Sequence, residues 1–240
     1  MALMEDLVKV CDGVYWNGGL EGDREIHISE TKFVRFMDFF YLRCPPDELT
    51  HIEVSALCRK RLENPEIISP ANNKVRDIFR NLIYALEPKT VLEVGAGNRP
   101  ILSEGDPKAI GIKYTKADAD PGFNNEFSGN KSKLEFPDNY FDLAAAVFVL
   151  HFHFYEEQIS ELSRCLSIDG VFVANVYCRT QQSREKLKQS FEDKGLKVLT
   201  RNDFLELCRH HEFWIVGKDD QRLQVVSSVL DGILENEKTG

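Results

Sequence analysis

The chain has 240 residues, of which 42% are hydrophobic, so one large domain or a domain with an appendage can bury a core without disulfide staples. Its formal net charge of -9 leaves no excess of basic surface, which disfavours the wrapping of a phosphate backbone or binding to anionic lipid. We therefore expect neither nucleic acid nor a membrane as the main partner.

The six cysteines are dispersed, and no two of them form a CxxC pair. This usage fits reduced thiols in a cytosolic protein better than a disulfide scaffold or a zinc knuckle. The amino-terminal MALMEDLVKVCDG has no apolar stretch long enough for a secretory signal, and no run in the sequence reaches transmembrane length. The sequence predicts a cytoplasmic protein.

The first part of the chain is predicted to be mainly helical. Residues 29–43 carry phenylalanines at helical spacing and stop before Pro45, which favours a helix there. Asp47 is the predicted cap of a second helix that runs to position 61, and Ser69 with Pro70 opens a third. We expect residues 1–70 to form a helical cap or lid.

After Pro88 the pattern changes to short apolar runs that alternate with helical stretches. This alternation predicts a doubly wound α/β sheet over residues 71–218, followed by a helix or tail at 219–240. The last two runs are expected to pair antiparallel at one edge. The predicted strands cover residues 90–94, 109–113, 141–149, 170–177, 197–200 and 213–218, and the predicted helices 155–165 and 183–194.

The segment TVLEVGAGNRP, residues 90–100, is the motif most suggestive of a ligand site. A buried strand runs into Gly95, Ala96 and Gly97, and glycines there let the backbone turn sharply and approach a ligand. A nucleoside or a charged group can lie over such a turn. Two glycines after a strand can also be no more than a tight turn.

Two later elements follow in order: LEFPDNYFDL from Leu134, which leads into AAAVFVLH, and LSRCLSIDGVFVANVY from Leu162. Together with the glycine turn they resemble class I S-adenosylmethionine-dependent methyltransferases, particularly the small-molecule branch. The resemblance covers roughly residues 75–218. It implies a seven-stranded Rossmann-like methyltransferase sheet and S-adenosyl-L-methionine as the cofactor. A nicotinamide-binding Rossmann turn would need a third glycine where Pro100 stands.

The family pattern implies roles for individual residues. Glu93 corresponds to the acid that faces the methionyl end of the cofactor, although a solvated charge at the strand end is the alternative. Lys113 occupies the predicted end of the second strand, where the family places a ribose-binding acid, so either Asp118 or Asp120 reaches in from the following loop or the ribose is held differently. The cofactor-binding residues implied are Glu93, Gly95, Ala96, Gly97, Asn98, Asp118, Asp120, Asn130, Lys131, Ala146 and Val147.

The interval between Gly97 and Gly111 leaves little room for a full helix after the glycine turn. Methyl transfer to a hydroxyl or a protonated amine needs a base, and histidine has the pKa for it. His151 and His153 follow the fourth-motif strand and are the candidate catalytic residues. The alternative is a structural loop whose histidines bind backbone carbonyls.

An aromatic concentration in the amino-terminal part suggests a lid over the acceptor, although these rings can equally pack a helical layer onto the sheet. The candidate lid residues are Tyr15, Trp16, Phe36, Phe40 and Tyr155. Neither His151 with His153 nor the group of Cys208, His210 and His211 has a recognisable four-ligand spacing, so no metal is expected.

The sequence thus predicts a methyltransferase that acts on oxygen or nitrogen of a small molecule. A protein methyltransferase and a degenerate, non-catalytic cofactor-binding partner protein are the alternatives. A homodimer stays open, and the sequence does not disclose the acceptor.

Overall fold

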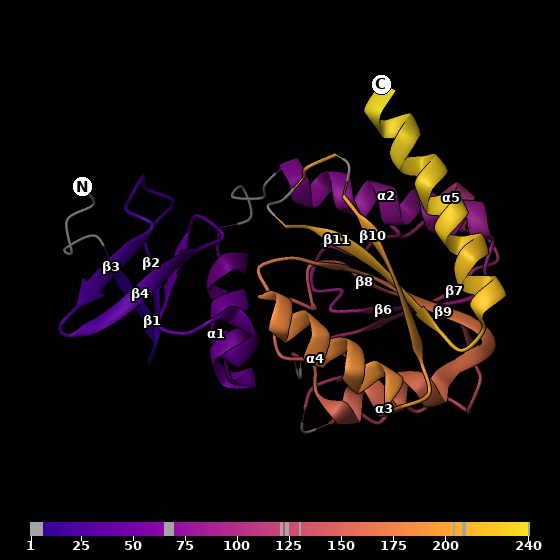
Figure 1. Ribbon diagram of the computed structural model, residues 1–240, viewed down its shortest axis with the longest axis horizontal. Helices are drawn as coiled ribbons and strands as arrows, with labels where there is room; N and C mark the ends of the chain where they lie inside the picture. Colours follow the sequence, from indigo (N-terminus) through magenta and orange to yellow (C-terminus); the bar gives the residue numbers. More distant parts are fainter. Residues whose placement is uncertain are drawn as a thin grey trace. The chain divides into compact units, whose positions relative to one another are not determined.

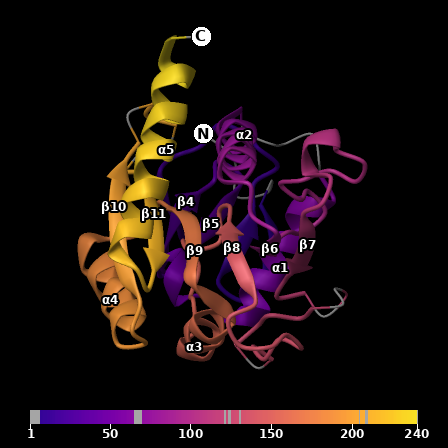
Figure 2. The same cartoon turned by 90° about the vertical axis from the view of Figure 1, so that its right-hand side faces the viewer.

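The computed structural model describes residues 7–64, 70–120, 122, 125–129, 131–203, 205–207 and 210–239. The chain divides into two compact units, Met1–Ile68 and Ser69–Gly240. Figure 1 labels most helices and strands of both, and Figure 2 labels β5 (Phe40–Leu42). No helix among the described residues is long and apolar enough to span a membrane.

The first unit is a five-stranded antiparallel sheet with one α-helix, so the prediction of a helical cap is wrong. The strands lie in the order β1-β2-β5-β4-β3. Their bounds are β1 Val8–Cys11, β2 Val14–Trp16, β3 Glu25–Ile28, β4 Thr31–Phe36 and β5 Phe40–Leu42, followed by a 3-10 turn at Pro46–Glu48 and α1 at His51–Leu62.

A hairpin accounts for the wrong helix over residues 29–43. Met37 and Asp38 both have positive φ, which turns β4 back on β5 and breaks any helix. The helical spacing of the phenylalanines therefore spans a strand, a turn and the next strand. The second predicted helix exists, but its cap is Thr50, whose side chain forms a capping box with Glu53.

The second unit contains a six-stranded sheet, in the order β10-β11-β9-β8-β6-β7, covered by helices on both faces. The strands β7, β6, β8 and β9 run parallel, and β11 lies antiparallel between β9 and β10, as predicted. The elements are α2 Pro70–Leu86, β6 Thr90–Val94, a 3-10 turn at Pro107–Ala109, β7 Lys113–Ala117, β8 Phe141–Ala146, α3 Glu156–Cys165, β9 Leu166–Val176, α4 Gln181–Glu192, β10 Lys197–Asn202, β11 Glu212–Gly217 and α5 Asp220–Thr239.

Two apolar cores lie on opposite faces of this sheet. Helices α3 and α4 cover one face and α2 and α5 the other, as Figures 1 and 2 show. Alternate strand residues serve the two cores: Leu92 and Ala144 face α3 and α4, whereas Val91 and Leu143 face α2 and α5. The central strands are buried on both sides, which explains their continuous apolar sequences.

Two details differ from the sequence-based expectation, and a third agrees with it. The part of the chain that the structure describes gives this sheet six strands rather than seven. The second strand is Lys113–Ala117 rather than 109–113, so its end lies four residues later than predicted. Residues 98–112, all described, contain one 3-10 turn and no α-helix between β6 and β7, as the short interval after Gly97 suggested.

Candidate cofactor site and its surroundings

The glycine turn lies at the carboxyl edge of the parallel strands. Val94 of β6 is in register with Ala117 of β7 and with Ala146 of β8, so the three strands end at the same level. Gly95 and Gly97 both have positive φ. A Cβ at Gly97 would meet no atom within 4 Å, whereas one at Gly95 would lie 2.3 Å from Val149 Cγ2. Open space therefore lies beside Gly97, while Val149 fills the space beside Gly95.

An acidic residue does stand at the end of the second strand, which corrects the concern over Lys113. Lys113 is the first residue of β7, and Asp118 directly follows its last. Asp118 Oδ2 accepts a hydrogen bond from the Gly97 amide at 2.9 Å, and its Oδ1 accepts one from the Asp120 amide at 3.0 Å. Burial raises the pKa of the Asp118 carboxyl, although these amides oppose the rise.

Glu93 lies beneath the glycine turn and not in the open space. Its side chain is fully buried, and its Oε2 accepts hydrogen bonds from the Tyr114 hydroxyl and, at 2.8 Å, from the Ile101 amide. Arg76 lies 3.4 Å from its Oε1. Burial raises the pKa of the Glu93 carboxyl, against these three partners. Glu93 thus fixes the loop after β6 to the strands.

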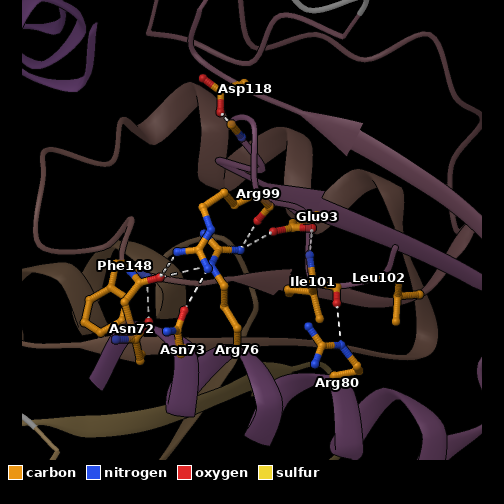
Figure 3. A network of polar contacts seen from close by, with 12 residues as sticks. Asn72, Asn73, Arg76, Arg80, Glu93, Arg99, Ile101, Leu102, Asp118 and Phe148 are labelled. Carbon is orange, nitrogen blue, oxygen red and sulfur yellow. Dashed lines mark hydrogen bonds and ion pairs between the residues drawn. The ribbon is translucent and has the colours of Figure 1, made fainter. Parts of the chain in front are cut away.

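Two arginines gather beside this loop, and Figure 3 shows them between α2 and the loop. The Arg76 guanidinium binds the Arg99 carbonyl and Asn72 Oδ1, and Arg99 Nη2 donates to Asn73 Oδ1 at 2.7 Å. Burial lowers the pKa of Arg76, Glu93 opposes that shift, and Arg99 adds to it. Arg76 is therefore the cation paired with the buried Glu93 carboxylate, and the Arg99 guanidinium is bound to Asn73 of α2.

The remaining residues implied for the cofactor include both buried and exposed side chains. Ala96, Ala146 and Val147 are buried around the turn, and Asn98 is exposed. Lys131 is exposed, and its ammonium lies 2.9 Å from Glu126 Oε2. Asn130 lies outside the described residues.

The two candidate histidines differ sharply in exposure. His151 is fully buried, and its ring packs against Phe152 and Tyr177 with centroids 4.0 and 4.8 Å apart. His153 is exposed, and its ring lies 4.3 Å from that of Tyr155. Of the two, only His153 is accessible to an acceptor in this conformation.

Four of the five candidate lid residues belong to the first unit. Trp16, Phe36 and Phe40 are buried there, and Tyr15 is half-buried against Phe33. The fifth, Tyr155, belongs to the second unit, where its ring lies against Gly129, whose added Cβ would meet it at 2.8 Å. These rings pack their own units, and a lid role stays a prediction.

A polar cavity of about 840 Å³ opens at the same carboxyl edge of the second unit. Its walls come from the loop before α4, the start of α4, and the segment that joins β10 to β11. They are formed by Arg179, Thr180, Gln181, Arg184, Asn202, Asp203, Glu206, His210, His211 and Glu212. Within the described ranges no group of three or more His, Cys, Asp or Glu is placed to hold a metal ion, and Cys208 lies outside them.

Residues 92–174 match a family model described as a methyltransferase domain. These residues run from the strand before the glycine turn to the strand that follows α3. Within the chain, this segment is thus similar to methyltransferase domains. No curated protein matches the chain.

Solved methyltransferase structures resemble the chain at low identity. A 1,6-didemethyltoxoflavin-N1-methyltransferase from Burkholderia thailandensis is 15% identical, with a TM-score of 0.48 over 81% of this chain and 98% of that one. A TehB-like methyltransferase from Corynebacterium glutamicum is 16% identical, with a TM-score of 0.46 over 70% of this chain and 98% of that one.

The sequence did not point to several residues beside the candidate cofactor site. Arg76 and Arg80 on α2 hold the loop after β6, where Arg80 Nε donates to the Ile101 carbonyl at 2.8 Å. Asn175 and His211 form a buried pair with Nδ2 and Nε2 3.0 Å apart. The short interval after Gly97 indicated that no full helix follows the turn, but not which residues hold the loop, and nothing in the sequence pattern linked position 175 to position 211.

Proposed function

We propose that this chain is an S-adenosylmethionine-dependent methyltransferase. It transfers a methyl group to oxygen or nitrogen of a small polar molecule. One observation carries the cofactor half of this proposal. The open space beside Gly97 is bordered by Asp118, which follows β7 directly and accepts the Gly97 amide proton. A carboxylate in that position can accept two hydrogen bonds from the vicinal hydroxyls of a ribose.

The residues present fit the methionyl end of the cofactor as well. Glu93 is fully buried and accepts hydrogen bonds from the Tyr114 hydroxyl and the Ile101 amide, so we propose that it does not contact the cofactor directly. We propose that Arg76 and Arg99 instead supply the positive charge that a carboxylate needs, because they lie together beside the loop after β6 and, of the two, Arg76 is the one paired with Glu93. We propose Asp118 rather than Asp120 as the ribose partner, because Asp118 is the one that bonds the Gly97 amide.

S-adenosyl-L-methionine supplies a methyl group on a positively charged sulfur, and the displacement is in line with the attacking atom. The protein positions the acceptor and excludes water from the reaction. When the acceptor carries a proton, a base must remove it, and we assign this role to His153 because its side chain is exposed. His151, which is fully buried, stabilises the turn around it.

We propose that the polar cavity of about 840 Å³, at the same carboxyl edge but lined by neither Gly97 nor His153, admits the acceptor before it reaches the reacting atoms. Its size suits a small molecule. Its walls carry hydroxyl, amide and charged groups from Thr180, Gln181 and Glu206, which favour a polar acceptor. A protein substrate would need an open groove, and no described feature favours one.

Calorimetry and turnover together test the proposal. S-adenosyl-L-homocysteine should bind the full-length chain, and incubation with labelled S-adenosyl-L-methionine and a panel of small polar hydroxyl and amine compounds should release the demethylated cofactor. Binding without turnover over a broad panel would support a non-catalytic partner protein. Turnover only with protein substrates would contradict the small-molecule assignment.

A further inference from the structure

A turn after β8 adopts a backbone conformation that needs support. Phe148 has a φ of 56°, in the left-handed region that bulky side chains rarely occupy. Its amide donates to Asn175 Oδ1 at 2.6 Å. Asn175 lies in β9 and is fully buried. The strained turn is therefore held by a side chain from the neighbouring strand.

The hydrogen bond to Phe148 fixes the direction of a longer chain of bonds. Since Asn175 Oδ1 accepts from the Phe148 amide, its Nδ2 faces His211 Nε2 at 3.0 Å and must donate to it. Nε2 is therefore unprotonated, and the neutral ring carries its proton on Nδ1. Nδ1 lies 2.8 Å from Asp203 Oδ2 and donates to it.

Asp203 is the last member of this series of hydrogen bonds, and its buried carboxylate accepts bonds from further donors. Its side chain is 1% exposed and that of His211 is fully buried. The Leu205 and Leu207 amides donate to it at 3.0 and 2.7 Å. Burial opposes ionisation of Asp203, but the bond from His211 and these amides hold its pKa below the usual range. Every bond runs in one direction, from the turn to the acid.

Ring contacts reinforce the same link. The Phe148 ring stacks on the His211 ring with centroids 6.2 Å apart and planes 15° apart, and it meets Tyr177 edge-on at 5.1 Å. Val149, the next residue, fills the space beside Gly95. The position of Phe148 thus decides where Val149 packs against the glycine turn.

From this geometry we infer that Asp203, His211 and Asn175 are positioning residues that set the shape of the glycine turn. They do so from β9 and from the segment that joins β10 to β11. They act through Phe148 and Val149 and do not contact the reacting atoms. That this turn binds the cofactor rests on the proposed function.

The test uses the full chain and two substitutions that break different bonds. His211→Phe keeps a ring against Phe148 but removes both hydrogen bonds. We expect hydrogen exchange of the Phe148 amide to accelerate about tenfold and S-adenosyl-L-homocysteine affinity to fall about tenfold, because one of the two lost bonds is the one that orients Asn175 toward the Phe148 amide. His27→Phe, at an exposed histidine in β3, is the matched control and should change neither.

Asn175→Asp supplies a second readout if His211→Phe does not fold. Its carboxylate still accepts from the Phe148 amide but cannot donate to His211, so the ring must take a proton on Nε2. In nitrogen-15 spectra, wild-type Nε2 should have the shift of an unprotonated imidazole nitrogen, which Asn175→Asp should change while the Phe148 amide stays protected.

Two results would overturn the inference: a protonated Nε2 in the wild type, or unchanged Phe148 exchange in His211→Phe. If the wild type does not bind S-adenosyl-L-homocysteine, the proposed function fails. Exchange and nitrogen shifts would still decide the positioning role.

Discussion

Individual polar residues around the glycine turn have distinct roles that their sequence positions did not reveal. Glu93 matches the family pattern but is buried and bonded within the protein. Asp118 lacked a clear role only because the second strand was predicted four residues too early. The bounds of this strand cannot be read from AIGIKYTKAD, because its most apolar part, Ala109 to Ile112, precedes the strand that forms at Lys113–Ala117.

Asp118→Asn should weaken S-adenosyl-L-homocysteine binding by about tenfold or more, because an amide replaces a charged acceptor of two hydrogen bonds. Asp120→Asn, two residues later, is the control and should leave affinity nearly unchanged. Isothermal titration of both variants measures this difference. A larger loss in Asp120→Asn would exchange the two roles.

Gly95→Ala and Gly97→Ala should differ in stability. Both have positive φ, which costs an alanine about 1 kcal/mol. At Gly95 the new methyl also collides with Val149, so a further loss of about 2 kcal/mol is expected. Urea denaturation measures both, and Val149→Ala should restore part of the stability only in the Gly95→Ala background. Equal losses would show that Val149 does not crowd Gly95.

The Glu93 carboxyl should give stability an unusual dependence on pH. Folding raises its pKa above the unfolded value of about 4.3, so its stabilising contribution is complete below that pH and is lost as the pH rises through the folded pKa. The free energy of unfolding of the wild type, relative to Glu93→Gln, should therefore fall as the pH rises from 4 to 7. A difference that rises over this range would show that the folded pKa is lowered.

At the scale of elements, most of the second unit followed from periodicity, and the first unit did not. The strand over 90–94 was predicted at its exact bounds, and the strands near 141, 170, 197 and 213 within a few residues at one or both ends. Long apolar runs between helices leave little ambiguity. In residues 29–43 the same kind of spacing indicated a helix, but a hairpin forms there. Its left-handed turn at Met37 and Asp38 contains no glycine, so nothing in the sequence indicated a turn.

Helix α2 anchors the loop that follows β6, where a 3-10 turn and no α-helix is found. Arg76 is the buried cation that faces Glu93, so Arg76→Met should destabilise the fold on the order of 3 kcal/mol by leaving a buried acid without its charge partner. Adding Glu93→Gln should recover much of that loss, which a double-mutant cycle in urea measures. Additive losses would mean that the two residues act independently.

At the scale of the whole molecule, the residues proposed for the cofactor all lie in the second unit, Ser69–Gly240. That unit has its own two cores, one on each face of the sheet. A chain of residues 70–240 should therefore unfold cooperatively and bind S-adenosyl-L-homocysteine with an affinity close to that of the full chain. Loss of binding from this folded fragment would assign part of the site to the first unit.

The most direct test of the account is titration of the full-length chain with S-adenosyl-L-homocysteine. The account predicts one molecule bound per chain, with affinity weakened in Asp118→Asn and preserved in Asp120→Asn. Absence of binding heat from the folded wild type, or equal binding by wild type and Asp118→Asn, would contradict the claim that the glycine turn and Asp118 form the cofactor site.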